Sequence, residues 1–118
     1  MDEVISIYTR TQAIEDGELV DVSETSEAKE VGFKIPVCVT RSLWSKMDGC
    51  KQDGQDIRGR LWDVCFLSLN QFRKNKAAGK DCHIVEFVVM FYEDRLPTML
   101  WLVFNEHEGF TLMFPSDY

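Results

Sequence analysis

Cysteine and histidine side chains can act as nucleophiles or hold a metal ion, and this chain has few of them. The chain has 118 residues with four cysteines, at positions 38, 50, 65 and 82, and two histidines, at positions 83 and 107. No C-x-x-C pair is present, and neighbours such as Cys82 and His83 point to opposite faces of a strand. We therefore expect no zinc at Cys82, His83 or His107, and no other cofactor. A Cys–His or Ser–His nucleophile pair that meets only in the folded chain stays open.

A second set of polar side chains lies between hydrophobic positions in the first third of the chain. In the structural interpretation, Arg10 or Arg41 donates a charge-assisted hydrogen bond to a nearby carboxylate and pins the N-terminal elements. The acceptor would be Asp16 or Asp21. In the functional alternative, the set forms a polar pocket or a partner-binding surface. The candidate residues are Tyr8, Arg10, Gln12, Asp16, Asp21, Thr40 and Arg41.

Short helices are expected to position these polar residues. A helix over residues 7–17 would end at a glycine, and Thr40 is a suitable N-cap for a helix over residues 41–47. Between them, Ser23 is the expected N-cap of a helix that ends at Gly32. Residues 19–22 and 33–39 are expected to be extended, the second because Pro36 disfavours helix for the residue before it.

The second half of the chain predicts one long amphipathic helix followed by strands. Apolar residues recur with helical spacing from about Asp56 to Ala78. Residues 84–92, 98–104 and 110–114 are rich in β-branched and aromatic side chains and are joined by hairpin-like connections. The sequence therefore predicts a single α+β domain over residues 1–118, with short N-terminal helices, the long helix and a C-terminal antiparallel meander of about three strands. The helix residues expected to face the sheet are Leu61, Val64, Cys65, Leu69 and Phe72.

The predicted sheet has apolar residues on both faces. Val85, Phe87, Val89 and Phe91 alternate on one face of the first strand, and the central strand, residues 98–104, is apolar on both. One helix covers only one face, so the other is covered by the short N-terminal helices or by a second molecule. In the second case a weak symmetric homodimer is expected.

Charge is unevenly distributed along the chain. Thirteen basic against twenty acidic residues give a net charge of −7. Residues 1–30 contain nine acids and two bases, whereas residues 49–80 contain seven bases and three acids. An acidic protein repels phosphate backbones, so general nucleic-acid binding is disfavoured, and the basic segment is simply explained by the solvated face of a helix. No apolar run suits a membrane span and the acidic start does not suit a secretory signal, so we expect a cytoplasmic protein with reduced cysteines.

Three segments together resemble a known family. They are IYTRTQAIEDGELVDV at residues 7–22, GFKIPVCVTR at residues 32–41 and RLWDV at residues 60–64, and TLMFPSD at residues 111–117 is similar to the family's usual ending. The family consists of small uncharacterised bacterial proteins, often encoded by phages and plasmids. This sequence departs from it in the short turn at residues 93–97, where relatives often carry a longer, more basic insertion. The resemblance implies a bacterial or mobile-element origin and assigns no activity.

The sequence leaves the function unknown, with three hypotheses. The leading one is a non-enzymatic accessory domain that binds another protein, because catalytic motifs are absent and apolar strand surface is in excess. The second is an acidic mimic of nucleic acid that inhibits a DNA-binding protein, suggested by the charge of residues 1–30. The third is an unrecognised small hydrolase or metal enzyme, which a deep pocket containing His83 or His107 would favour.

Overall fold

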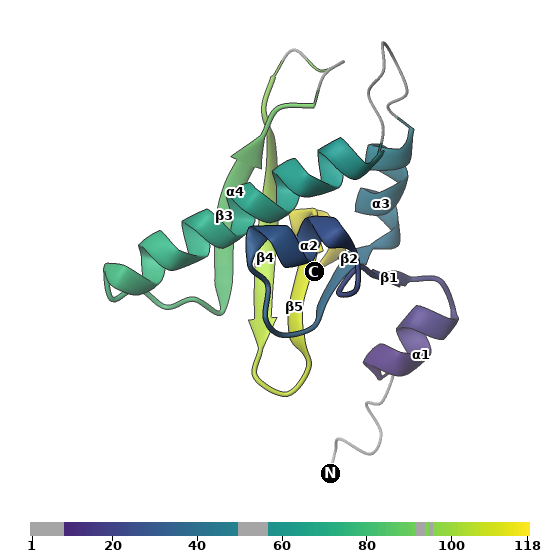
Figure 1. The fold of residues 1–118 in the computed structure, drawn as a ribbon, viewed down its shortest axis with the longest axis horizontal. Coiled ribbons are helices and arrows are strands. Elements are labelled where there is room, and N and C mark those ends of the chain that lie inside the picture. The colour runs from purple at the N-terminus through teal and green to yellow at the C-terminus, as the bar shows by residue number, and fades with distance from the viewer. Residues whose placement is uncertain (1–8, 50–56, 92–93, 95) are drawn as a thin grey trace.

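Helices and strands alternate in the first half of the chain, and strands dominate the end of it (Figure 1). The structure is a computed structural model that describes residues 9–49, 57–91, 94 and 96–118. The elements are α1 (Arg10–Glu15), β1 (Leu19–Asp21), α2 (Ser26–Val31), β2 (Val37–Thr40), α3 (Arg41–Asp48), α4 (Ile57–Ala77), β3 (Ile84–Val89), β4 (Thr98–Asn105), β5 (Gly109–Met113) and the 3-10 helix η1 (Pro115–Asp117).

The strands form one mixed sheet with the order β1-β2-β5-β4-β3. All neighbours pair antiparallel except β2 and β5, which are parallel. The α+β class is confirmed, but the prediction of a three-stranded C-terminal sheet is wrong in extent. The two N-terminal extended segments are themselves strands of the same sheet. β2 pairs with β5, a strand that is distant from it in the sequence.

Gly109 permits the close approach of β2 to β5. Its φ is +100°, in the region that favours glycine, and a Cβ atom there would collide with the carbonyl oxygen of Pro36. That same carbonyl accepts a hydrogen bond of 2.9 Å from the Phe110 N–H. The parallel ladder then continues with Val37 opposite Phe110 and Val39 opposite Leu112.

One face of the sheet carries the hydrophobic core under α4, with α2 and α3 packed beside that helix (Figure 1). The predicted phase of the long helix is confirmed: Leu61, Val64, Cys65 and Leu69 are buried, and Phe72 is half-buried at the margin. The predicted alternation on β3 is confirmed as well. Val85, Phe87 and Val89 on the strand are all buried, and so is Phe91, two residues beyond its end.

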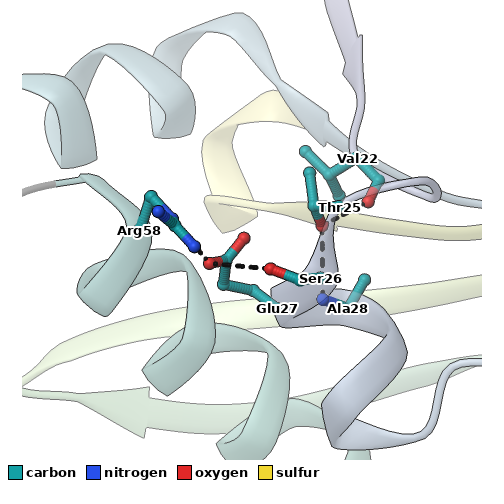
Figure 2. A network of polar contacts seen from close by, with 6 residues as sticks. All are labelled: Val22, Thr25, Ser26, Glu27, Ala28 and Arg58. Carbon is teal, nitrogen blue, oxygen red and sulfur yellow. Dashed lines mark hydrogen bonds and ion pairs between the residues drawn. The ribbon is translucent and has the colours of Figure 1, made fainter.

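The start of α2 differs from the prediction. Thr25, not Ser23, is the N-cap: its hydroxyl accepts from the Ala28 N–H and donates to the Val22 carbonyl (Figure 2). Ser23 instead joins β1 to β2, because its hydroxyl contacts both the N–H and the carbonyl of Val37. The expected ends at Gly32 and Thr40 are confirmed, with Gly32 left-handed after α2 and Thr40 capping α3.

An ion pair joins α2 to α4. Arg58 Nε lies 2.9 Å from Glu27 Oε2, and the Ser26 hydroxyl donates to the same carboxylate (Figure 2). The hydrogen bond from Arg58 lowers the pKa of the Glu27 carboxyl below its ordinary value. The contact is local to one edge of the helical layer, and it neutralises one of the N-terminal acids.

Removing the Leu69 side chain should destabilise the fold. Leu69 is 5% exposed, so Leu69→Ala should lower the free energy of unfolding, measured in urea, by about 2–5 kcal/mol. Leu96 is 76% exposed, so Leu96→Ala is a matched control that should change stability by less than about 0.5 kcal/mol. Equal effects of the two substitutions would contradict the phase of α4.

The Glu27–Arg58 pair should make stability depend on pH. The folded-state pKa of Glu27 lies below that of the unfolded chain, so the pair stabilises the fold above pH about 4.3, and this contribution disappears as the pH falls through the folded pKa. Arg58→Met should raise the Glu27 pKa, measured by carboxyl NMR, and its destabilising effect should shrink on acidification. Arg73→Met is the control. An unchanged Glu27 pKa in Arg58→Met would show that the pair does not form.

Candidate functional site

Three of the seven candidate polar residues lie together. Arg10, Thr40 and Arg41 line a hollow of about 530 Å³ bounded by α1, β1, the start of α3 and the C-terminal segment. Residues that sequence reasoning did not single out complete its lining, among them Thr111 and Asp117. Residues from the N-terminal and the C-terminal segments of the chain therefore line the same hollow.

Arg10 fastens α1 to β5. Its guanidinium donates one hydrogen bond of 3.0 Å to the Thr111 hydroxyl and a second to the Phe110 carbonyl. The Thr111 side chain points to the face of the sheet opposite the helical layer, because it alternates with the core residues Phe110 and Leu112. Arg10 thus holds α1 against that second face.

Arg41 connects the start of α3 to the turn after α1. Its main-chain N–H donates to the Glu18 carbonyl at 2.9 Å, and its guanidinium donates to the Gly17 carbonyl at 3.3 Å. Both Arg41 contacts use main-chain oxygens as acceptors, whereas Arg10 uses one main-chain oxygen and the Thr111 hydroxyl. They give both arginines a positioning role in the N-terminal elements.

Asp117 closes the hollow at the N-terminus of α3. Its carboxylate accepts hydrogen bonds of 2.8 Å from the Thr40 hydroxyl, of 2.8 and 2.7 Å from the Ser42 hydroxyl, and of 3.0 Å from the Phe114 N–H. A carboxylate at this position also interacts favourably with the positive end of the helix dipole. The signal in the sequence was only an acidic residue after Pro115, which does not reveal its distant partners.

The other candidate residues serve local structure. Gln12 completes a capping box with Thr9 at the start of α1, Asp16 is the C-cap of that helix, and Asp21 accepts a hydrogen bond of 2.9 Å from the Ser23 N–H. None of these three lines the hollow. Tyr8 lies outside the described residues.

The charges of the hollow are mixed. Arg10 and Arg41 stand among three carboxylates, those of Glu18, Glu108 and Asp117. Such a lining has no net preference for an anion, and several of its polar groups are already bonded to one another. The arrangement therefore suits a structural contact between α1, α3 and the C-terminal segment better than a ligand site.

Cys82, His83 and His107 line a different hollow, of about 590 Å³, which we call the histidine hollow. It is open, because both histidines are exposed. The Cys82 thiol is directed to the main-chain carbonyls of Phe72 and Lys80, whereas the His83 ring contacts the Phe104 carbonyl and the Tyr118 hydroxyl. These contacts do not form a Cys–His nucleophile pair, which requires the thiol and the ring to contact each other.

Two other cysteines are poor nucleophiles. Cys38 and Cys65 are buried, as predicted, and burial raises the pKa of both thiols, that of Cys65 to about 12. In the part of the chain that the structure describes, no three His, Cys, Asp or Glu side chains are grouped so that they could hold a metal ion. The expectation of a protein without zinc stays a prediction.

An apolar surface is exposed on the second face of the sheet. We call Val88, Met90 and Met99 the β3–β4 patch; they are 54%, 55% and 46% exposed, and Val88 and Met99 are directly opposite each other on β3 and β4. The short helices do not cover it: α2 and α3 pack with α4 on the other face, and α1 lies beside β1 at the far edge (Figure 1). On the same face, the Tyr118 ring packs against Trp101, with the ring centroids 5.6 Å apart.

The fold defines an α+β domain with a mixed five-stranded sheet. A family of unknown function, DUF6573, matches residues 1–93, and the chain therefore belongs to this family. The match includes the N-terminal segments and α4 but ends before β4 and β5. No curated protein and no solved structure matches the chain.

Asp117→Ala should destabilise the protein by about 1 kcal/mol, because the N-terminus of α3 loses a nearby carboxylate and the hydroxyls of Thr40 and Ser42 lose their acceptor. Urea unfolding measures the loss. Ser116→Ala, at an adjacent exposed position, should leave stability within about 0.5 kcal/mol of wild type. A loss no greater than that of the control would mean that the carboxylate does not hold the C-terminal segment.

Proposed function

We propose that this chain is a non-enzymatic accessory domain, of bacterial or mobile-element origin and cytoplasmic, that binds another protein through the β3–β4 patch. Free thiols at Cys38, Cys65 and Cys82 suit a reducing compartment. No helix among the described residues is long and apolar enough to cross a membrane.

The exposure of the β3–β4 patch supports this proposal most directly. Large apolar side chains that are about half exposed, and that lie side by side on a regular sheet, are typical of a surface that is buried on association. The patch also borders β3, an outer strand of the sheet. An outer strand offers unpaired main-chain groups to a binding partner.

In a sample of the purified protein, a second copy of the chain can occupy the β3–β4 patch. Two-fold symmetry places the same patch of each subunit against the other, so one self-complementary surface is enough. With only a few large side chains in the patch, the area buried is small for a permanent dimer. We therefore expect a weak homodimer that a tighter protein partner displaces.

The other hypotheses have less support. The Cys82 thiol and the His83 ring of the histidine hollow contact different main-chain carbonyls, which gives the hydrolase alternative little basis. The nucleic-acid mimic remains a prediction from the acidity of residues 1–30, where Glu24 and Glu27 are neutralised by Lys29 and Arg58.

Sedimentation equilibrium up to about 1 mM should detect the weak homodimer, and Met99→Lys should abolish it, because a lysine opposite Val88 would place a charge in the contact. Phe66→Lys is the matched control: Phe66 is 44% exposed but lies on α4, on the opposite side of the sheet, and this variant should dimerise as wild type does. A monomer at every concentration, or equal effects of both substitutions, would refute association through the patch.

A further inference from the structure

A separate hollow lies on the helical side of the sheet, lined by residues of α4, of the segment after α2, and of β4 and β5, which Figure 1 shows next to one another. We call it the phenylalanine hollow, and its volume is about 320 Å³. Phe110 is at its centre and is 5% exposed, and three half-buried rings surround it. The centroids of Phe33, Phe72 and Phe104 lie 5.3, 5.1 and 5.2 Å from that of Phe110.

Cations form the rim of this apolar hollow. Lys34, Arg73 and Lys76 line it, all three are exposed, and no acidic residue is among its lining. The adjoining histidine hollow shares Phe72, Lys76 and Phe104 with it, and its own charged residues, Lys80, Asp81 and Glu106, are of both signs. The lining of the phenylalanine hollow is thus positive on a protein whose net charge is −7.

One of these cations lies close to the main chain. Gly32 has a φ of +117°, and a Cβ atom on it would lie 3.0 Å from Arg73 Nη2. The absence of a side chain at position 32 therefore leaves room for the guanidinium next to the end of α2, where it lines the hollow.

We propose that the phenylalanine hollow binds an acidic peptide segment of a partner protein, with one large apolar side chain of that segment inserted among the four rings. The volume suits a single Phe or Leu side chain, and the three cations complement carboxylates on either side of it. This surface lies on the opposite side of the sheet from the β3–β4 patch, so the inference does not depend on the homodimer.

The geometry favours a peptide over nucleic acid. Phe33 and Phe72 meet Phe110 edge to face, at interplanar angles of 75° and 88°, so these rings do not form the parallel platform on which bases stack. A nucleic-acid groove also needs cations along the path of the phosphates, whereas the adjoining hollow adds the carboxylates of Asp81 and Glu106.

NMR titration of the wild-type chain with a synthetic peptide tests the proposal. The probe is a nine-residue peptide with a central phenylalanine and four Asp or Glu residues on each side. It should shift the amide signals of Phe33, Phe72 and Phe104 with a Kd of about 1 mM or tighter. A peptide with alanine at the centre should bind about tenfold more weakly, and one with lysines in place of the acids should not bind.

Charge reversal at the rim provides the matched variants. Arg73→Glu and Lys76→Glu should each weaken binding about tenfold, whereas Lys74→Glu, on an exposed position of α4 outside the lining, should leave it unchanged. Amide spectra without peptide show whether each variant is folded. The proposal is overturned if the acidic peptide causes no shifts at the hollow, or if the alanine peptide binds as well. Tighter binding of a nine-nucleotide oligothymidylate would assign the surface to nucleic acid instead.

Discussion

The parallel pairing of β2 with β5 joins the two halves of the chain into one sheet. The Phe110 N–H binds the Pro36 carbonyl, and this requires glycine at position 109. With β2 in place, α3 begins at the end of that strand, next to the C-terminal segment. The contacts of Thr40 and Ser42 with Asp117 follow from this arrangement.

The same pairing determines how the faces of the sheet are covered. The connections on either side of β2 place α2, α3 and α4 on one face, where they enclose the core. Among the described residues, the second face carries α1, fastened by Arg10, and Tyr118, whose ring packs against Trp101. Burying one face with three helices therefore leaves the β3–β4 patch exposed.

The two proposed surfaces differ in chemistry, which suits two kinds of contact. The β3–β4 patch is apolar and regular, and it lies beside an outer strand. The phenylalanine hollow is concave and has a cationic rim, where α4 supplies Arg73 and Lys76. The basic segment of the sequence thus contributes a localised positive rim, and part of the acidity of the N-terminal region is neutralised within the fold, as in the Glu27–Arg58 pair.

Local patterns in the sequence were sufficient to predict the α+β class, the phase of α4, the alternation on β3 and the roles of Thr40 and Gly32. When one face of a helix or strand is buried, apolar residues recur in the sequence at the spacing of that helix or strand. A helix cap depends on residues within one turn. Only the tertiary structure decided the parallel β2–β5 pairing, the cap at Thr25 in place of Ser23, and the contacts of Arg10 and Asp117. Each depends on a partner distant in sequence: Ser23 was a suitable cap, but its hydroxyl is bound to the main chain of Val37. No local pattern records which strand will lie beside another, so the hollow shared by Arg10, Thr40, Arg41 and Asp117 exists only in the folded chain.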